Sequence, residues 1–353
     1  MSSRYLLRFS YLGTKYRGMQ RQSARPNIET CTVQGVIETA LQRLNPLSEP
    51  GIVLASRTDR GVHAIVNAAH TDLVPSNTTQ SFHPDFITSV VNYYLTRNGH
   101  DVIIRKTEQV PGWFHSRHLA HERSYVYRVA VLKPHLLEES AFKTTYRMYL
   151  PIAELNQCHV IPQLNLDRVH EAMELMSGTH DFRSFKNVNR THEQEMRPTI
   201  KEILTFQLRP SPRMSSFPDP NYENVELWEF YIKSKSFLYR QVRRMVSAAL
   251  YASSGTHSLD SIRDMLRKPD KLSWDSRIII VPPCGLFLSG IEYDKKYFDL
   301  DCEPPEEILS CYNRFNNAKD NDESDDTEET DPTDEDSGQE VEEAEKVSQP
   351  VQT

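Results

Sequence analysis

The sequence has few cysteines, and their spacing is unsuited to a metal site. Its 353 residues include five cysteines, and no two of them form a C-x-x-C pair. Scattered cysteines of odd number are typical of free thiols in a reducing compartment, and they argue against a disulfide scaffold. We therefore expect no zinc or other metal site, and the residues indicate no cofactor. The cysteines are Cys31, Cys158, Cys284, Cys302 and Cys311.

Long apolar runs are also missing. No stretch is apolar over the roughly 20 residues that a membrane-spanning helix needs, so we expect no membrane partner. A strand-like pattern begins by Arg4, which leaves no room for a secretory signal or an obvious amphipathic presequence. The location stays open between cytoplasm and mitochondrion, because a short or cryptic organelle signal is compatible with these residues.

Basic residues are outnumbered in the whole chain but not in the part expected to fold. The formal net charge is −8. Residues 301–353 hold 19 acidic and 3 basic side chains, so residues 1–300 hold 30 acidic and 38 basic ones, a net charge of +8. A basic body indicates a polyanionic partner. Residues 313–353 are acidic and nearly free of aromatic side chains, so we expect a disordered tail.

The first 110 residues carry the signals of a split βαβ unit. Apolar and aromatic runs predict strands at 4–11, 52–54, 67–73 and 101–110. A stripe of apolar residues behind the capping residue Thr32 predicts a helix over 32–44, and Pro84 opens a second helix over 84–95. The order strand–helix–strand–strand–helix–strand is that of ferredoxin-like domains. We expect an α+β fold with an N-terminal half at 1–110.

A C-terminal half is expected over residues 111–300. Its predicted elements are helices at 166–176, 237–251 and 259–266 and strands at 197–208, 225–234 and 285–293. Helix 166–176 is expected to be capped near Asp167.

One short loop carries the strongest chemical signal. Residues 55–64 (ASRTDRGVHA) follow the 52–54 strand and place Asp59 between Arg57 and Arg60, two residues before Gly61. A carboxylate flanked by two cations stays ionised, and loops at strand ends commonly display reactive groups. Structural ion pairs give the same pattern, so these residues alone support a salt-bridged turn and a reactive aspartate about equally.

The run RTDRGVHA at 57–64 resembles the signature of the TruA family of tRNA pseudouridine synthases. The resemblance implies that Asp59 is the catalytic nucleophile. Residues 114–128, with F-H-S-R and R-x-Y-x-Y, resemble the family's second signature, which implies that Tyr125 packs on the target base. Residues 237–246 fit F-x-x-x-x-V-R-x-x-V, the third signature, which implies that Arg243 pairs with the aspartate. The likeness covers about residues 4–293, and two of these stretches most resemble an animal branch of the family.

The resemblance also implies a fold and a reaction. The fold is that of pseudouridine synthases, in which two ferredoxin-like halves form a mixed, mostly antiparallel sheet flanked by helices, with a central basic cleft. The reaction breaks the C1′–N1 bond of uridine in tRNA or another structured RNA and reattaches the uracil through C5, without cofactor or metal. Arg57 is expected to fill the space of the flipped nucleotide or to hold it. The family's habit further implies a homodimer.

Two residues depart from the family pattern. Met19 stands where the family has tryptophan in G-W-Q-R-Q, and Ser247 stands where it usually has glycine. The role of the missing indole and the packing of the 237–251 helix are therefore open.

Basic side chains near these motifs are expected to contact the RNA backbone, because such contacts dominate affinity for nucleic acids. His115, His118 and His121 recur every third residue, but no carboxylate pattern accompanies them, which favours a basic strip over a metal site. The expected phosphate contacts are Lys15, Arg17, Arg21, Arg117, Arg123, Arg240 and Arg244.

Two functions from different classes fit the sequence. The first is an active pseudouridine synthase, and the second is a catalytically silent RNA-binding or assembly factor on the same fold. Arg57, Asp59, Tyr125 and Arg243 are all present, which favours activity. Neither the RNA nor the uridine that is modified follows from the sequence.

Overall fold

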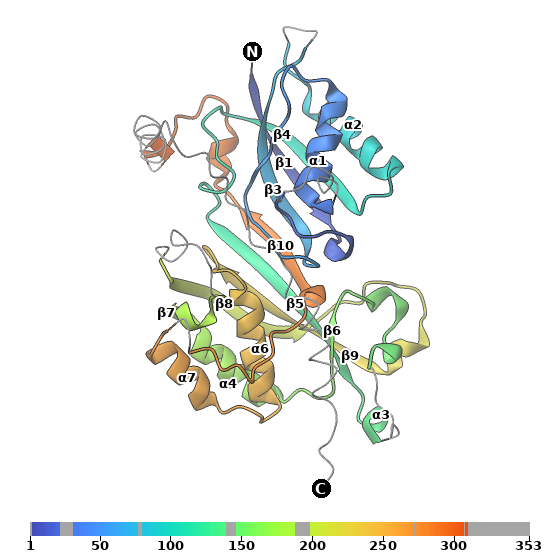
Figure 1. Cartoon of the computed structure of the whole chain (residues 1–353), viewed down its shortest axis with the longest axis vertical. Helices are drawn as coiled ribbons and strands as arrows, with labels where there is room; N and C mark the ends of the chain where they lie inside the picture. The colour runs from blue at the N-terminus through green and yellow to red at the C-terminus, as the bar shows by residue number, and fades with distance from the viewer. Residues whose placement is uncertain are drawn as a thin grey trace. The chain divides into compact units, whose positions relative to one another are not determined.

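A computed structural model describes residues 2–21, 31–76, 80–138, 146–187, 198–270, 273–306 and 308–309. Within these ranges, ten strands form a mixed sheet that is flanked by helices (Figure 1). The predicted α+β class is confirmed. The expected disordered tail, 313–353, lies outside the described residues.

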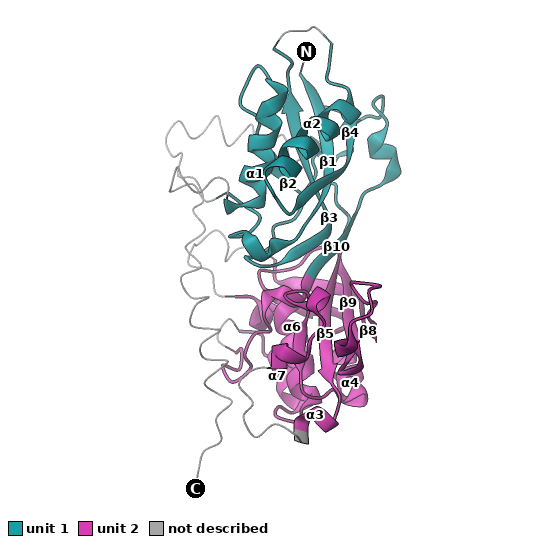
Figure 2. Cartoon of the chain, turned by 90° about the vertical axis from the view of Figure 1, so that its right-hand side faces the viewer, with its two compact units in different colours: residues 1–123, 287–331 teal, residues 124–286, 332–353 magenta. Residues whose placement is uncertain are grey.

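The chain divides into two compact units (Figure 2). Of the described residues, unit 1 comprises 2–123 and 287–309, and unit 2 comprises 124–286. The predicted boundaries, 1–110 and 111–300, differ from this division. They differ because the chain returns to unit 1 at Phe287, and a return over so many residues leaves no local signal in the sequence.

Unit 1 holds the predicted order strand–helix–strand–strand–helix–strand. β1 lies between β4 and β3 and is antiparallel to both, β2 pairs with β3, and β10 lies on the other side of β3. The helices are α1 and α2. The bounds are β1 Ser3–Tyr11, α1 Val33–Leu41, β2 Val53–Leu54, β3 His63–Leu73, α2 Pro84–Arg97, β4 Val102–Val110 and β10 Leu286–Glu292.

The β10 strand pairs with the last residues of the 55–64 motif, where β3 begins. It runs parallel to β3, with Phe287 opposite His63 and Leu288 opposite Ala64. The His63 and Phe287 rings stack with centroids 4.6 Å apart, and His63 is fully buried. A parallel pair cannot be closed by a tight hairpin, so this pairing depends on the fold of the intervening chain.

Unit 2 has its own strand order, β5-β9-β8-β7, with β6 parallel to β5. The helix α4 packs against both α6 and α7. Asn165 rather than the predicted Asp167 caps α4, since its side chain accepts from the Arg168 amide at 3.1 Å. The bounds are β5 Glu122–Leu132, α3 His135–Glu138, β6 His159–Ile161, α4 Leu166–Met176, β7 Gly178–Asp181, β8 Ile200–Pro210, β9 Val225–Ser234, α6 Gln241–Ser253 and α7 Leu259–Arg267.

A buried ion pair ties the loop after β8 to β5. The side chains of Arg128 and Glu154 are 3% and 0% exposed, and their Nη1 and Oε2 atoms lie 2.6 Å apart. Arg128 also donates from Nε to the Ser211 hydroxyl at 2.9 Å and from Nη2 to the Pro212 carbonyl at 2.7 Å. Glu154 accepts through Oε1 from the Met214 amide at 2.8 Å. The charges are compensated in place, which buried ions require.

A second buried ionisable group is His70 in the middle of β3. It is 4% exposed, and its Nδ1 atom accepts from the Ser116 amide at 3.2 Å, so the neutral ring carries its proton on Nε2. Burial, and after it the charge of Arg4, lowers the pKa of His70 to about 3. A protonated ring could not accept the hydrogen bond from the Ser116 amide, and it would place a positive charge in a buried site.

This histidine is expected to make the protein less stable in mild acid. In the unfolded chain His70 binds a proton near pH 6.5, whereas in the folded chain it does so only near pH 3. Its stabilising contribution is therefore complete above pH 6.5 and is lost as the pH falls toward 3. Between pH 8 and pH 5 it should remove about 2 kcal/mol from the free energy of unfolding.

Urea unfolding at pH 8 and pH 5 measures this contribution. His70→Asn, which keeps an acceptor for Ser116, should lose less stability over the interval than the original protein. His170 on α4 is exposed, and His170→Asn serves as the control. Equal losses for His70→Asn and the original protein would contradict the prediction.

Candidate active site

The loop between β2 and β3 carries Asp59, and its backbone is anchored before that residue. The Ala55 amide donates to the Ala68 carbonyl at 2.9 Å, and the Ser56 carbonyl accepts from the Asn67 side chain at 3.1 Å. Arg123 donates from Nη2 to the Ala55 carbonyl at 3.1 Å. The chain is thus fixed where it leaves the sheet.

The residue next to Asp59 is anchored through both its side chain and its backbone. The Thr58 hydroxyl hydrogen-bonds with the Tyr11 hydroxyl at 2.7 Å, and the Thr58 carbonyl accepts from the Met19 amide at 3.1 Å. Met19 also accepts through its carbonyl from the Gln34 amide at 3.0 Å. Met19 therefore reaches the motif through its main chain, so this contact does not depend on the side chain that replaces the family's tryptophan.

A tight turn fixes the loop after Asp59. The Val62 amide donates to the Asp59 carbonyl at 3.2 Å, and Gly61 has φ +77°, a left-handed conformation that favours glycine. Gly13 packs against this turn so closely that a Cβ there would lie 1.9 Å from the Val62 carbonyl oxygen. The backbone on both sides of Asp59 is therefore held in one geometry.

The side chains of the motif differ in exposure. Asp59 is half-buried, whereas Arg57 and Arg60 are exposed. Hydrogen bonds at Ala55, Thr58 and Val62 hold the backbone around Asp59. The loop therefore presents a half-buried aspartate from a backbone of fixed geometry.

Tyr125 lies near the start of β5 in unit 2. It is 7% exposed, and its ring meets the Phe237 ring edge to face with centroids 5.2 Å apart. Tyr127 is fully buried and donates its hydroxyl to the Pro282 carbonyl at 2.8 Å. Burial raises the pKa of Tyr127 well above its usual value. Both tyrosines of the second signature are therefore buried, and Tyr127 is buried completely.

Arg243 occupies the first turn of α6 in the same unit. It is 4% exposed, and its Nε atom donates to the Val281 carbonyl at 2.8 Å. Because Nε is occupied in this way, the guanidinium can meet an anion only with its Nη atoms, the edge that binds a carboxylate end-on. Arg240, at the N-cap position of α6, has a positive φ of 59°, and its guanidinium carbon lies 5.3 Å from the centroid of the Tyr239 ring.

The neighbouring Arg244 has a different environment from the one expected. It is 6% exposed and donates through Nη1 to the carbonyls of Ser184 and Lys186, at 3.2 and 2.7 Å. Its guanidinium also lies 4.7 Å from the Trp274 ring centroid. A phosphate contact from this buried position is at odds with the packing, so we assign Arg244 to the fold of unit 2.

The other predicted phosphate contacts fall into two groups in unit 1. Arg17 and Arg117 are exposed, as are Lys15 and Arg21, which form ion pairs with Asp101 at 2.9 Å and Glu38 at 3.1 Å. Exposed ion pairs are weak, so phosphate can compete for these two cations.

Arg123 forms the second group. It is half-buried and donates to the carbonyls of Ala55, Arg117 and Ala120 at 3.0–3.3 Å. It holds the motif loop in place, a role that differs from the expected phosphate contact.

The histidine-rich segment packs ring on ring. The His115 and His118 rings have centroids 4.2 Å apart, and His115 lies 4.9 Å from His70. Burial, with the nearby charge of His118, lowers the pKa of His115 to about 4. Within the ranges that the structure describes, no three His, Cys, Asp or Glu side chains are grouped to hold a metal ion, and no helix is long and apolar enough to cross a membrane.

Comparison with known proteins identifies the family. A family model described as tRNA pseudouridine synthase matches residues 172–294. tRNA pseudouridine synthase-like 1 of Xenopus laevis is 32% identical over 293 residues, which cover 83% of this chain and 92% of that protein. The chain belongs to the TruA family of tRNA pseudouridine synthases.

Two further relatives place the chain within the TruA family. Human tRNA pseudouridine synthase-like 1 is 31% identical over 293 residues, covering 82% of this chain and 90% of that protein. tRNA pseudouridine synthase A of Jannaschia sp. is 29% identical over 297 residues, covering 84% and 97%. The chain falls in the animal tRNA pseudouridine synthase-like 1 branch of the TruA family.

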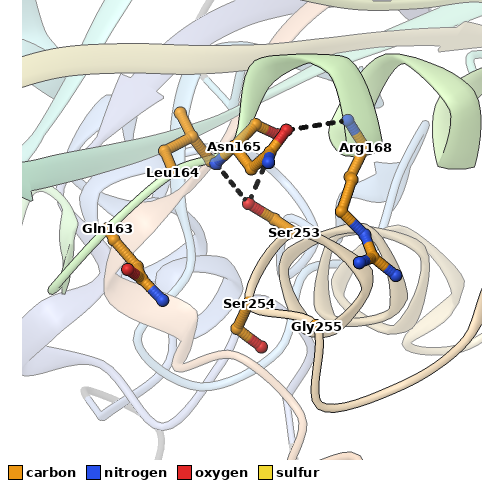
Figure 3. Close-up of a pocket in the computed structure, with 7 residues that line it drawn as sticks. All are labelled: Gln163, Leu164, Asn165, Arg168, Ser253, Ser254 and Gly255. Atoms are coloured by element: carbon orange, nitrogen blue, oxygen red, sulfur yellow. Dashed lines mark hydrogen bonds between the residues drawn. The ribbon is translucent and has the colours of Figure 1, made fainter.

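A polar pocket of this TruA-family chain is lined by none of the predicted site residues. It has a volume of about 390 Å³ and sits in unit 2 between the start of α4 and the end of α6 (Figure 3). The backbone amide of Asn165 donates to the Ser253 hydroxyl at 2.7 Å, and this bond joins the two helices at the pocket. The lining residues are Gln163, Leu164, Asn165, Arg168, Ser253, Ser254 and Gly255.

Sequence reasoning missed the residues that brace the site. Tyr11 and Asn67 support the motif loop, and Val281 holds Arg243. Asn67 left a signal, because a buried asparagine within an apolar strand needs hydrogen-bond partners. Val281 left none, since it acts through its backbone.

Proposed function

We propose that this chain isomerises uridine to pseudouridine in tRNA. The observation that carries the proposal is the Asp59 carboxylate, half-buried in the TruA signature on a loop held on both sides by hydrogen bonds. The printed names of the relatives support tRNA as the substrate. The net charge of +8 on residues 1–300 supports a polyanionic partner.

In the proposed reaction Asp59 is the nucleophile. Its carboxylate attacks C1′ of the uridine as the C1′–N1 bond breaks, and the uracil leaves with the bonding electrons. The turned uracil then attacks C1′ through C5 and displaces the carboxylate. C5 loses its proton and N1 gains one, so substrate and product are isomers, and no electrons are exchanged with another molecule.

The uridine must leave its stack before Asp59 can reach C1′. Flipping costs a few kcal/mol, and stacking of a base on an aromatic ring returns roughly 1–3 kcal/mol. We assign the stacking to Tyr125, whose ring is held by Phe237. Arg57, exposed beside the nucleophile, is assigned to hold the flipped nucleotide or to fill its place. Arg243 is assigned to orient the Asp59 carboxylate through its Nη atoms.

The phosphate contacts are assigned to cations that the fold leaves accessible. These are Lys15, Arg17, Arg21 and Arg117, together with the half-buried Arg240. Arg123 and Arg244 are omitted, because their guanidinium groups already bind carbonyl oxygens within the fold. We further propose that the fold has two ferredoxin-like halves with a central basic cleft, and that the chain forms a homodimer. The order of strands and helices in unit 1 supports a ferredoxin-like first half.

Product formation on tRNA tests the function. The full chain is incubated with a panel of unmodified tRNA transcripts, and pseudouridine is detected by carbodiimide labelling and reverse transcription, since the isomer has the same mass as uridine. We expect reverse transcription to stop at one or a few labelled positions in the tRNA. If tRNA binds tightly but stays unmodified across the panel, the chain is an RNA-binding factor instead.

A further inference from the structure

One face of α6 is bonded to a segment that follows α7. Arg243, Ser247 and Tyr251 are spaced four residues apart, so they share a face of the helix. The Tyr251 hydroxyl accepts from the Ile279 amide at 3.1 Å, and the Ser247 hydroxyl accepts from the Val281 amide at 2.8 Å. Together with the bond from Arg243 to Val281, three successive turns of α6 hold residues 279–281.

Ser247 occupies the centre of this arrangement. Its hydroxyl accepts from the Val281 amide and donates to the Arg243 carbonyl, each at 2.8 Å, and the side chain is fully buried. A hydroxyl has one hydrogen to donate, so these two bonds determine its orientation. The Val281 peptide is therefore held at its amide by Ser247, while its carbonyl holds the Nε atom of Arg243.

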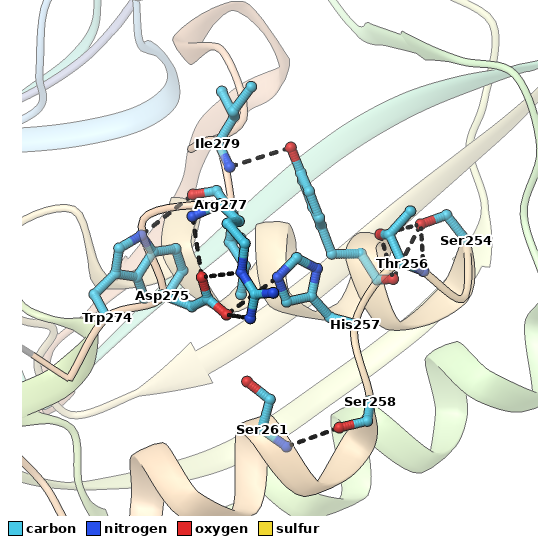
Figure 4. Close-up of polar contacts among 11 residues, drawn as sticks. Ser254, Thr256, His257, Ser258, Ser261, Trp274, Asp275, Arg277 and Ile279 are labelled. Carbon is cyan, nitrogen blue, oxygen red and sulfur yellow. Dashed lines mark hydrogen bonds and ion pairs between the residues drawn. The ribbon is translucent and has the colours of Figure 1, made fainter. Parts of the chain in front are cut away.

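The far end of the segment is fixed independently. Asp275 accepts from Arg277 at 2.9 and 2.7 Å and lies 3.2 Å from the Nε2 atom of His257 (Figure 4). The Trp274 indole donates to the Ile278 carbonyl at 3.2 Å. Hydrogen bonds of the Arg277 side chain hold the pKa of the Asp275 carboxyl well below its usual range. The segment therefore reaches α6 from a fixed point, and Ser247 determines where its last peptide sits.

We propose that Ser247 is a positioning residue for the isomerisation. It places the Val281 carbonyl, and that carbonyl sets the rotation of the Arg243 guanidinium and thereby the direction of its Nη atoms. The inference rests on the proposed function, because it concerns the orientation of Arg243 during that reaction. Ser247 does not contact the substrate, and its effect passes through two hydrogen bonds.

The test compares Ser247→Ala with a matched serine. Ser184 is equally buried in unit 2, donates to the Met265 carbonyl at 2.8 Å and accepts from the Asp270 amide at 3.3 Å, but does not bond Val281. Both variants lose one buried hydroxyl. We expect Ser247→Ala to lower kcat on tRNA about five- to tenfold with KM within twofold, the loss expected from one hydrogen bond that orients a reacting group. Ser184→Ala should retain kcat at a temperature where all variants are folded.

Two further variants separate positioning from packing. Ser247→Thr keeps the hydroxyl and should recover most of the lost kcat. Adding Ser247→Ala to Arg243→Lys should lower kcat no further, because residues that act through one another are not additive. Unchanged kcat in Ser247→Ala, or full additivity with Arg243→Lys, would overturn the inference.

A readout without turnover distinguishes this inference from the function on which it rests. The Nε–H of Arg243 should exchange slowly with solvent by NMR in the original protein and at least tenfold faster in Ser247→Ala. If that difference is found but the original protein forms no pseudouridine, the proposed function fails while the geometry stands. If the original protein is active and the exchange rate does not change, the inference about Ser247 fails alone.

Discussion

Asp59→Asn is expected to abolish pseudouridine formation while tRNA still binds. The amide is nearly the same size as the carboxylate but cannot attack C1′, and loss of a nucleophile typically lowers kcat by about 10⁴-fold or more. The motif loop is held by backbone bonds and by Thr58 and Tyr11. We therefore expect the fold, the melting temperature and the tRNA affinity to stay close to those of the original protein.

Single-turnover kinetics with excess protein and labelled tRNA measure the effect, and filter binding measures the affinity. Asp72→Asn is the matched control, since Asp72 also lies in unit 1 and pairs with Arg4 at 2.6 Å at the exposed end of β3. It should retain nearly full activity. If Asp59→Asn turned over at the original rate, Asp59 would not be the nucleophile. A loss of tRNA binding in Asp59→Asn would mean that the side chain serves recognition instead.

Glu154→Ala is expected to destabilise unit 2 by about 3–5 kcal/mol, the range for breaking a buried ion pair. The change leaves the guanidinium of Arg128, 3% exposed, without its counter-charge. It also removes the acceptor of the Met214 amide and of the Tyr222 hydroxyl, which bind Glu154 at 2.8 and 3.0 Å. Three polar groups thus lose a partner at once, and the charge of Arg128 is buried.

Chemical denaturation followed by circular dichroism measures this loss of stability. Glu226→Ala provides the comparison, because Glu226 on β9 pairs with Lys133 on the surface, with about half of its side chain exposed. Its removal should cost less than about 1 kcal/mol. Similar losses for the two variants would show that the Arg128–Glu154 pair does not stabilise unit 2.

Local signals in the sequence were enough for many elements. Thr32 caps α1 through its hydroxyl, as predicted, and β9 spans the predicted residues 225–234. Caps and strand runs depend on side chains close in sequence, so their signal survives without tertiary information. The three signatures, among them the motif at 57–64, were also sufficient to predict the family, because they specify residue types at fixed spacing.

The tertiary structure gave different environments to basic residues that the sequence alone does not distinguish. Arg243 and Arg244 are adjacent and basic, yet one binds the carbonyl of Val281 and the other binds carbonyls near Ser184. Likewise, Arg123 was expected at phosphate, and the fold places it on the motif loop. A charge pattern in the sequence cannot distinguish a solvated cation from one that donates hydrogen bonds to backbone carbonyls within the fold.

The sequence by itself determined the family, the α+β class, the signature residues and the approximate place of many elements. Only the tertiary structure determined that β10 pairs with β3, that the loop of Asp59 is braced by the amide of Met19, and that Ser247 connects to Arg243 through Val281. The physical reason is the same for all three. Each depends on backbone amides and carbonyls brought together from distant parts of the chain, and every residue type except proline supplies both groups.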